Sequence, residues 1–393
     1  MQESRMGGIE HNSFAIAKRA KDQGIEICFL CPNRGLLTQL LRETGIQYVV
    51  LSRPPFLSTS IRIGSRSVLN PIAIAYDSII VFVAAFQISI WMKRHRPPLV
   101  VTKGLLANVY GSIAARMAGI PALWDVQEIV RSARARGALW RFLNALAKFL
   151  PTHLSVSSEA ARDQFDAVLH RKISVIPNGI SLKRFHPRVD RNRFRTELGV
   201  DDDTCLVGHV GRFTYWKGQM EFVNAASEVH ERYPRVRFVL VGSPVFENDA
   251  YERSVKQYVK EQGLGSCIFF RDYRMDLEYV LASLDIYVHS SIEPEGCSLT
   301  LLYAMAMEKA VVVTAVQGND EVVTDGVNGV LVAPKSHTAI TEAVLTLVND
   351  PLKRQALGKR ARELVKEKFD LERSASNTLA LYQQFLKDES ANS

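Results

Sequence analysis

The sequence predicts an α/β protein with a doubly wound parallel sheet in each half of the chain. Two observations support this fold class. At 393 residues the chain is too long for one ordinary core, and short β-branched apolar runs alternate with helical patterns along its length. Continuous apolar strands separated by helices are typical of parallel sheets covered on both faces. The composition, 47% hydrophobic and 23% charged, is that of a globular protein and excludes a disordered chain.

The predicted strands form two successive series, which are listed here by residue number: 25–31, 47–51, 98–102, 122–124, 153–156 and 173–176, then 205–210, 236–242, 267–270, 285–291, 310–314 and 329–332. The stretch "NGISLKRFHPRVDRN" between the series is polar, basic and proline-containing, so we place the domains at 1–185 and 186–371. Ligands of open parallel sheets bind beyond the carboxyl ends of the strands, which predicts a site in the cleft between the domains. Only "MQESR" precedes the first glycine turn, so the opening strand is either a stub or lies upstream of this sequence.

Charge is spread unevenly along the chain. Residues 1–190 carry 25 Lys+Arg against 12 Asp+Glu, a net charge of +13, whereas the remaining residues carry 24 against 29, a net charge of −5. A basic first domain predicts an anionic partner, for which phosphate-bearing substrates, anionic lipid headgroups and nucleic acid all qualify. The chain has no recognisable aromatic-basic reading motif, so nucleic acid is the least favoured of the three.

Cysteine usage and the N-terminus bear on the compartment. Five cysteines in a long chain argue against a disulfide framework and for a reducing, cytoplasmic location. Cys28 and Cys31 form a CxxC pair within a predicted strand, but no second pair accompanies them, which argues against a metal or redox site. No charged-then-apolar signal sequence opens the chain.

Two segments raise the question of a membrane. Residues 71–92 are long and apolar enough to be considered as a span, but Pro71, Asp77 and Gln87 interrupt them, so a buried or membrane-surface helix is favoured. Residues 131–150 interleave arginines with leucine, tryptophan and phenylalanine. That pattern fits either a helix on an anionic membrane or a core-packed helix with a solvated basic face.

Two loops carry the strongest candidates for chemistry. "GRFTYWKG" follows the first strand of the second domain and places Arg212 and Lys217 before a helix, where cations and free N–H groups suit a diphosphate. The alternative is an ordinary solvated basic loop. "EPEGCSLT" follows the strand at 285–291, and Gly296 permits a tight turn there. Glu293 and Glu295 are either charges that stabilise the helix N-terminus or carboxylates that hold sugar hydroxyls.

Three further stretches are weak by themselves. "MGGIE" is a glycine turn into a helix, "IPNGI" is a turn after a strand, and "WDVQEIVRS" follows a first-domain strand with several polar side chains.

Taken together and in order, GGxE, "AARMAGIP", "IPNGI", "GRFTYWKG" and "EGCSLTLLYAMA" resemble family 4 of the retaining glycosyltransferases over nearly the whole chain. The resemblance implies a GT-B fold: two facing Rossmann-like domains, with a C-terminal helix at 372–393 that crosses back to the first. It also implies an activated sugar on UDP or GDP held mainly by the second domain, an acceptor on the first, and no metal or other cofactor.

The resemblance also assigns roles to individual residues. Arg212 and Lys217 are expected to stabilise the departing diphosphate, and Glu295 to contact the donor sugar. The remaining donor-side residues that it implies are Gly7, Gly8, Asn178, Gly211, Gly296, Cys297, Ser298 and Leu299.

Three positions depart from the family pattern. Tyr303 stands where the second glutamate, which binds the ribose, is expected, and a phenol accepts fewer hydrogen bonds than a carboxylate. Gln127 stands where many members have a histidine near the donor sugar, and glutamine cannot become cationic. "MEKA" at 307–310 replaces a small Cys-Gly-x-Pro turn. We therefore expect both Tyr303 and Gln127 to lie at the donor site with altered chemistry.

The leading hypothesis is a retaining, metal-independent glycosyltransferase that moves a sugar from a nucleotide sugar, UDP favoured over GDP, to a hydroxyl acceptor. The acceptor would be a sugar, glycolipid or small molecule in glycan or polysaccharide biosynthesis, with peripheral contact to an anionic membrane left open. The alternative is a non-catalytic GT-B subunit that binds a nucleotide sugar or a partner protein. Sugar-nucleotide epimerases share the architecture, and fold alone does not exclude them.

Overall fold

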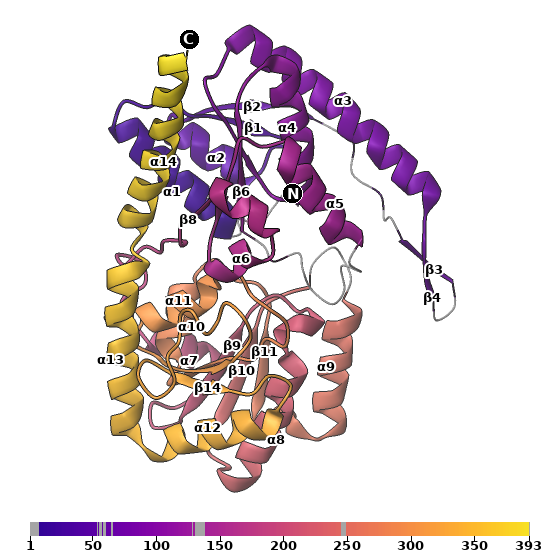
Figure 1. Ribbon diagram of the computed structural model, residues 1–393. Helices are drawn as coiled ribbons and strands as arrows, with labels where there is room; N and C mark the ends of the chain where they lie inside the picture. Colours follow the sequence, from indigo (N-terminus) through magenta and orange to yellow (C-terminus); the bar gives the residue numbers. More distant parts are fainter. Residues whose placement is uncertain are drawn as a thin grey trace.

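The protein folds into two lobes, drawn one above the other in Figure 1. The structure is a computed structural model that describes residues 8–52, 54, 57, 60–63, 66–127, 129, 138–244 and 249–392. The last strand of the first lobe is β8 (Ile173–Val175) and the first strand of the second lobe is β9 (Leu206–Val210). The boundary predicted at residue 185 lies between them, before helix α7 (Asn192–Leu198).

The second lobe is built on six parallel strands in the order β11-β10-β9-β12-β13-β14. The other strands are β10 (Arg237–Val241), β11 (Ile268–Arg271), β12 (Ile286–His289), β13 (Ala310–Thr314) and β14 (Val330–Val332). The order runs outward in both directions from β9 and β12, so the topological switch lies between these two strands. The loops that follow them diverge, which leaves a crevice at their carboxyl ends.

Helices cover both faces of this sheet. They are α8 (Gln219–Arg232), α9 (Ala250–Glu261), α10 (Leu277–Ser283), α11 (Leu299–Ala306), α12 (His337–Asn349) and α13 (Pro351–Lys368), with short 3-10 turns η2 (Tyr215–Lys217) and η3 (Leu264–Ser266). Along β13, Val311 and Val313 belong to one buried cluster while Ala310 and Val312 belong to the other. This alternation explains why the strand is an unbroken apolar run in sequence.

The first lobe contains a four-stranded parallel sheet in the order β5-β6-β7-β8 and a parallel pair β1-β2. The strands are β1 (Cys28–Cys31), β2 (Gln47–Val50), β5 (Val100–Lys103), β6 (Ala122–Val126) and β7 (His153–Val156). The helices are α1 (Gly8–Asp22), α2 (Leu36–Glu43), α3 (Pro71–His95), α4 (Leu105–Ala118), α5 (Ala138–Phe149), α6 (Glu159–Asp163) and η1 (Ala167–Lys172). Each of the twelve predicted runs overlaps a strand, and the α/β prediction is confirmed.

One hairpin was not predicted. Strands β3 (Ser60–Ile63) and β4 (Arg66–Leu69) pair antiparallel, and Figure 1 shows them projecting from the first lobe at the start of α3. In the sequence "SIRIGSRSVL" the arm before Gly-Ser alternates polar and apolar residues, but the arm after it does not. The Gly-Ser pair and the single alternating arm are a weak hairpin signal.

Helix α3 begins and ends on strong local signals. The Asn70 side chain accepts a hydrogen bond from the Ala73 N–H at 3.2 Å, and Pro71 occupies the first helical position. At the other end Arg96 takes a left-handed conformation with φ 45°, and two prolines follow it. Proline cannot continue a helix, so the stop at His95 is fixed by sequence.

The chain returns to the first lobe at its C-terminal end. Helix α14 (Leu371–Asn392) follows α13 and packs on α1, where Ala375 and Leu379 share a buried cluster with Ile16 and Ala20. The crossing point is tight, because a methyl group on Gly179 would lie 2.6 Å from the Leu371 Cα. The crossover helix expected at 372–393 is therefore present.

All five cysteines are free, as the sequence predicted. Burial, reinforced by neighbouring Cys28, raises the pKa of the Cys31 thiol to about 11. The CxxC pair therefore stays protonated at neutral pH and contributes to the packing of β1.

Candidate active site

The candidate site lies where β9 and β12 end, on either side of the topological switch. The loop after β9 contains Gly211, Arg212 and Lys217, and the loop after β12 runs through Glu295 to the start of α11. Since the carboxyl ends of neighbouring parallel strands meet at one sheet edge, two motifs about 80 residues apart in sequence come together there.

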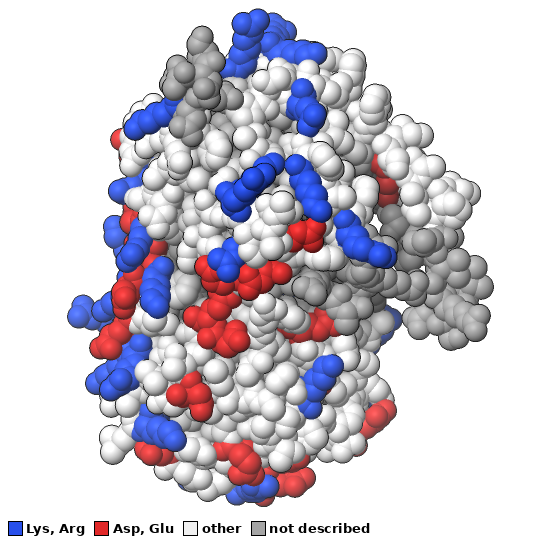
Figure 2. All heavy atoms as spheres, viewed as in Figure 1, with Lys and Arg blue, Asp and Glu red and all other residues white. Residues whose placement is uncertain are grey.

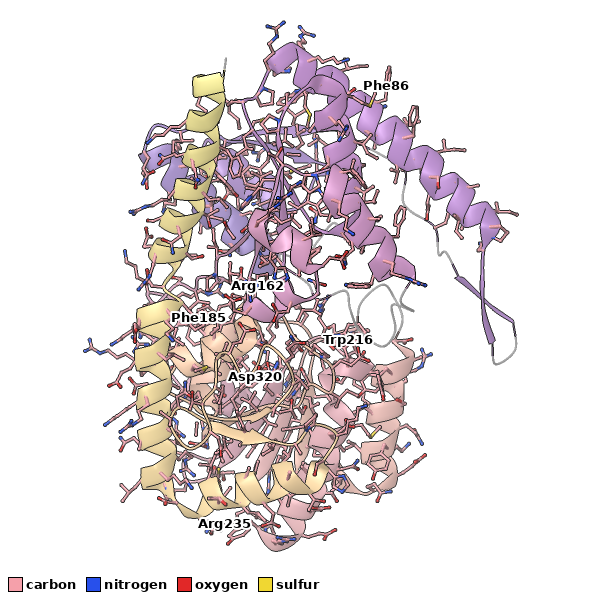
Figure 3. The ribbon with its side chains drawn as sticks, in the orientation of Figure 1. Phe86, Arg162, Phe185, Trp216, Arg235 and Asp320 are labelled. Atoms are coloured by element: carbon pink, nitrogen blue, oxygen red, sulfur yellow. The ribbon has the colours of Figure 1, made fainter. Side chains whose placement is uncertain are left out.

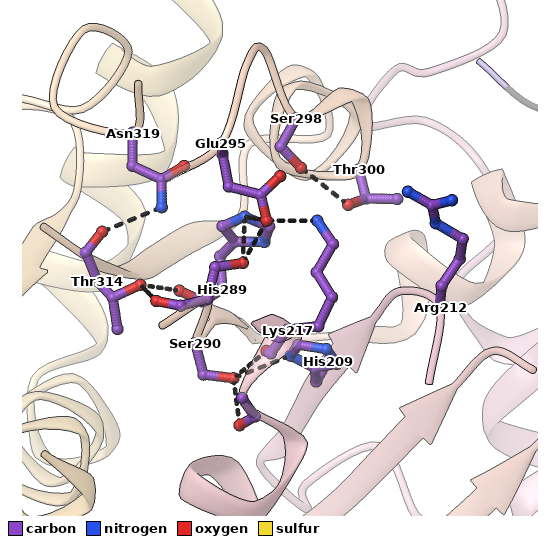
Figure 4. Close-up of polar contacts among 12 residues, drawn as sticks. His209, Arg212, Lys217, His289, Ser290, Glu295, Ser298, Thr300, Thr314 and Asn319 are labelled. Carbon is purple, nitrogen blue, oxygen red and sulfur yellow. Dashed lines mark hydrogen bonds and ion pairs between the residues drawn. The ribbon is translucent and has the colours of Figure 1, made fainter. Parts of the chain in front are cut away.

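Lys217 and Glu295 form a buried ion pair at the centre of the site (Figure 4). Lys217 Nζ lies 2.6 Å from Glu295 Oε1, and the two side chains are 11% and 13% exposed. The same carboxylate oxygen accepts a hydrogen bond from Ser291 Oγ at 2.5 Å, and His289 Nε2 lies 3.8 Å away. The sequence predicted both charged residues but not that they pair.

The electrostatics of this cluster fix its protonation. Burial opposes ionisation of Glu295, but the Lys217 charge, His289 and hydrogen bonds from Lys217 and Ser291 together outweigh it and lower the pKa of Glu295 to about 2. Burial together with the Lys217 charge lowers the pKa of His289 to about 4. At neutral pH the site therefore holds a carboxylate, an ammonium group and a neutral imidazole, so Glu295 can accept hydrogen bonds but cannot act as an acid.

A buried serine and a glycine hold the Lys217 loop against β12. Ser290 Oγ donates to the Gly218 carbonyl at 2.8 Å and also contacts the Lys217 carbonyl at 3.1 Å. Gly218 has φ +67°, and a methyl group there would come within 1.9 Å of the Ser290 carbonyl oxygen. Only glycine fits this position, so the approach of backbone to backbone sets the place of Lys217.

Arg212 differs from Lys217 in having no hydrogen-bond or ion-pair partner for its guanidinium among the described residues. It is exposed, and Figure 4 shows it on the same side of the site as Thr300, at the start of α11. Its backbone is fixed, because its carbonyl accepts from Gln219 Nε2 at 2.7 Å. A positioned backbone with an unpaired guanidinium suits an anionic ligand.

Helix α11 begins at this site. Ser298 stands at its N-cap position without making a capping bond, and its hydroxyl instead lies 3.3 Å from Thr300 Oγ1. Burial raises the pKa of the neighbouring Cys297 thiol to about 12, although the backbone of Asn178 hydrogen-bonds to it. Leu299 is the first helical residue. The uncapped first turn and its dipole favour a negative charge.

The first lobe reaches this helix through Gln127. A methyl group on Gly296 would lie 2.9 Å from the Gln127 carbonyl oxygen and 3.2 Å from Ser157 Oγ, so the two lobes touch here. Gln127 Oε1 and Ser157 Oγ are both buried and find no hydrogen-bond partner within the described part of the chain. Buried polar atoms of this kind are ordinarily satisfied, which marks these two as candidates for a hydrogen bond to a ligand.

A charged network within the first lobe holds the Gln127 side chain. Its amide nitrogen donates to Asp125, whose other carboxylate oxygen pairs with Lys103. Burial favours loss of the Lys103 proton, but Asp125 and Tyr382 reverse that effect and raise its pKa. Tyr382 belongs to α14, so the crossover helix lies close to this network.

Two further contacts lie near the site. Within the first lobe, Asn12 of α1 donates from its side-chain amide to Asn178 Oδ1, in the turn after β8, at 2.8 Å. The other contact joins the lobes. Glu321 in the second lobe accepts hydrogen bonds from the Glu159 and Ala160 N–H groups at 2.9 and 2.6 Å, at the start of α6. Figure 3 shows this region between the lobes, with Arg162 and Asp320 marking its two sides.

Tyr303 occupies a position that the sequence did not predict. Its ring stacks on Phe185 with a centroid separation of 3.9 Å and an interplanar angle of 8°. Burial raises the pKa of Tyr303 to about 12, against the effect of nearby Arg184. The residue therefore has a packing role at the join of the lobes, and its donor-binding role stays a prediction.

The structure brings together most of the predicted residues and adds several. Gly8 is the first residue of α1, and Gly7 lies outside the described residues. His289, Ser290, Ser291 and Ser157 were not predicted. Polar residues directly after an apolar strand, as in "DIYVHSS" and "HLSVSSE", were the available signal.

Two family profiles match consecutive parts of the chain. The profile described as Glycosyltransferase Family 4 matches residues 6–184, and the profile described as Glycosyl transferases group 1 matches residues 190–364. Together they cover both lobes, including every motif of the site.

Individual relatives agree with the profiles. The lipopolysaccharide core biosynthesis mannosyltransferase LpcC of Rhizobium leguminosarum bv. viciae is 31% identical over 229 residues, which cover 58% of this chain and 64% of that protein. The match thus spans less than two thirds of that protein's own length. The N,N'-diacetylbacillosaminyl-diphospho-undecaprenol alpha-1,3-N-acetylgalactosaminyltransferase of Campylobacter jejuni is 26% identical over 97% of this chain and 96% of its own.

Among solved structures, Alr3699/HepE of Anabaena in complex with UDP and glucose superimposes with a TM-score of 0.81 at 23% identity, covering 98% of both chains. At this identity the likeness shows the fold alone.

Proposed function

The chain belongs to family 4 of the glycosyltransferases and has the GT-B fold, and from this premise we propose that it moves a sugar from a nucleoside diphosphate sugar to a hydroxyl acceptor. We further propose that transfer retains the anomeric configuration, needs no metal, and uses UDP in preference to GDP. The acceptor would be a sugar or glycolipid in lipopolysaccharide or related glycan biosynthesis, on the cytoplasmic side of a membrane.

The observation that carries the proposal is the group of cations at the switch point. The unpaired Arg212 guanidinium, the Lys217 ammonium and the uncapped start of α11 converge on one place. A diphosphate leaving group develops negative charge as the sugar departs, and preorganised cations and dipoles stabilise that charge. The charge that a metal would supply can come from these groups, which is the reason for proposing metal independence.

The remaining groups suit a sugar. Ionised Glu295 can accept hydrogen bonds from sugar hydroxyls, and neutral His289 keeps its side of the site uncharged. A bound diphosphate must share the Lys217 ammonium with Glu295. The diphosphate and a sugar bound to Glu295 would therefore lie close together. Gln127 Oε1 and Ser157 Oγ, on the opposing lobe, are buried without partners among the described residues and can hydrogen-bond to a neutral hydroxyl once the lobes admit one.

The preference for UDP rests on similarity. The Anabaena structure of the same fold is a complex with UDP and glucose, whereas LpcC is named a mannosyltransferase. The lipid-linked acceptor is suggested by the name of the Campylobacter relative.

The test is calorimetric titration of the purified protein with UDP and GDP, each with and without EDTA. We expect tighter binding of UDP, unchanged by EDTA, and loss of binding in Lys217→Ala. Active donors are then screened with alkyl glycoside acceptors, and the anomeric configuration of the product is read by proton NMR. Failure to bind either nucleotide would favour the non-catalytic subunit, and binding that requires a metal would refute metal independence.

A further inference from the structure

Helix α3 is apolar all the way round, yet only one of its faces is covered. It is the one helix of the described residues long and apolar enough to cross a membrane, by length and composition only. Ala73, Ile80, Ala84, Ala85, Ile88 and Met92 are buried, and α3 packs on α4 along this face. Helices with this composition are ordinarily buried on all sides. The protein itself therefore covers only one face of this helix.

The opposite face forms a continuous exposed stripe. Ile72, Phe82 and Ile79 are 78%, 65% and 64% exposed. The stripe comprises Ile72, Tyr76, Ile79, Val83, Phe86 and Ile90, spaced alternately by four and three residues, with Phe82 beside it. Such spacing places the side chains on one side of a helix about 37 Å long. Figure 3 marks Phe86 on the outer side of α3, and the surface around it is mostly white in Figure 2.

Charge identifies what could cover this stripe. Between residues 44 and 124 the sequence carries eight Lys+Arg and a single acidic residue, Asp77. The Asp77 carboxylate is engaged, since it accepts from the Leu57 N–H at 2.9 Å. Lys93, Arg94 and Arg96, all exposed, close the C-terminal end of the helix. An apolar stripe inside a basic segment complements an anionic lipid surface.

The same observations argue against two other ways of covering the exposed stripe of α3, a membrane-spanning orientation and a second copy of the chain. A membrane-spanning helix would meet lipid on all sides, whereas α3 keeps one face against α4. A second copy of this chain would bring an equally basic segment against the first, because a two-fold contact pairs a surface with itself.

We propose that α3 lies flat in the surface of an anionic membrane, with its exposed stripe in the boundary between headgroups and acyl chains. Its basic C-terminal end would contact lipid phosphates, and the face on α4 would hold the lobe against the bilayer. The proposal does not depend on the transfer reaction. It refines the sequence prediction of a buried or membrane-surface helix, because one face of α3 is buried against α4 and the other is exposed to the membrane.

The experiment is sedimentation of the full-length protein with vesicles of phosphatidylcholine alone and of phosphatidylcholine mixed with phosphatidylglycerol. Wild-type protein should sediment with the mixed vesicles and much less with the neutral ones. Phe82→Ser/Phe86→Ser should weaken binding by more than roughly tenfold. Lys93→Gln/Arg94→Gln should weaken it by roughly tenfold on the mixed vesicles only. Leu352→Ser is the matched control, because Leu352 is 79% exposed on α13 in the other lobe.

Circular dichroism melting of every variant separates loss of binding from loss of folding, and Ile72→Ser/Ile79→Ser provides a second pair on the same stripe. Loss of vesicle binding in both stripe variants, with unchanged melting and an unaffected control, supports the proposal. Wild-type protein that sediments with neither vesicle overturns it, as do stripe variants that bind like wild type. A wild-type dimer in size-exclusion chromatography that the stripe variants dissociate, without vesicle binding, would assign the stripe to a second copy.

Discussion

The two lobes present different kinds of polar group to the site between them. In the second lobe, Lys217 and Glu295 are already paired with each other, and Ser291 donates a hydrogen bond to the same carboxylate. In the first lobe, Gln127 Oε1 and Ser157 Oγ are buried without partners among the described residues. A ligand of the second lobe must therefore compete with Glu295 for the Lys217 ammonium. A ligand of the first lobe would instead hydrogen-bond to the unpartnered Gln127 and Ser157 oxygens. Changes in the second lobe should have large effects and changes in the first small ones.

The largest effect is expected from Lys217→Ala. Removal of a group that stabilises the leaving diphosphate should lower turnover by roughly 10²- to 10³-fold. The change also leaves Glu295 buried without its counter-charge, which should cost about 3 kcal/mol of unfolding free energy. Activity assays and urea unfolding measure the two effects.

The matched control is Arg232→Ala, which removes an exposed arginine at the end of α8 that is paired with exposed Glu342 at 2.8 Å. A surface pair of this kind contributes about 0.5 kcal/mol or less, so both measurements should stay near wild type. Equal losses in the two variants would mean that burial of the Lys217–Glu295 pair is not what distinguishes it.

Acid should destabilise the second lobe through the same cluster. The pKa of His289 is about 4 in the folded protein and 6.5 when unperturbed, so below pH 6.5 the unfolded chain binds a proton that the folded chain refuses. Stability should therefore fall as the pH drops from 6.5 to 4, by on the order of 2 to 3 kcal/mol from this residue. Glu295, with its lowered pKa, adds a further loss in the same direction between pH 4.5 and 2.

The measurement is urea unfolding at pH 7, 5.5 and 4.5 for wild type and His289→Gln. The variant has no imidazole to titrate, so its stability should fall less steeply with pH. Identical slopes in the two proteins would show that His289 is not held neutral by the site. His209, whose pKa burial and His289 lower to about 3, stays buried in the variant but loses the influence of His289, so it can only add to the difference between the two slopes.

A smaller effect is expected in the first lobe. Gln127→Ala removes one neutral hydrogen-bond acceptor and should lower turnover by roughly tenfold or less, with nucleotide affinity unchanged. Steady-state kinetics and UDP titration separate these quantities. Gln39→Ala is the control, because Gln39 is exposed on α2 and its side-chain nitrogen donates to neighbouring Glu43 at 2.8 Å. A loss of nucleotide affinity in Gln127→Ala would place Gln127 on the donor instead of the opposing hydroxyl.

The sequence predicted the sheets well, because parallel strands buried on both faces are continuous apolar runs. It did not predict the β3–β4 hairpin, whose two strands contain polar residues and form no continuous apolar run. It also left α3 as either buried or at a membrane surface, since composition alone cannot show that only one face meets α4. Such a distinction depends on which helix packs nearby, and that is a property of the tertiary structure.

The candidate site was also predictable only where its features are local in sequence. Arg212, Lys217 and Glu295 could be predicted, because each lies at the end of an apolar strand and the motifs are local. The ion pair between Lys217 and Glu295 could not, because it depends on β9 and β12 being neighbours in the sheet. The approach of Gly296 to the Gln127 carbonyl likewise requires the two lobes to meet, which no local pattern encodes.

Tyr303 lies where the two lobes join, and loss of its hydroxyl alone should show the smallest effect. Its ring stacks on Phe185, so Tyr303→Phe should preserve stability, while Tyr303→Ala should cost about 3 kcal/mol of unfolding free energy. If the phenol also contacts the donor, Tyr303→Phe should weaken UDP binding by roughly fivefold, the value of one neutral hydrogen bond. Calorimetry on the phenylalanine variant isolates the hydroxyl because the stack remains. Unchanged affinity would make Tyr303 a packing residue only, and the donor would then be held by the charged groups of the second lobe without it.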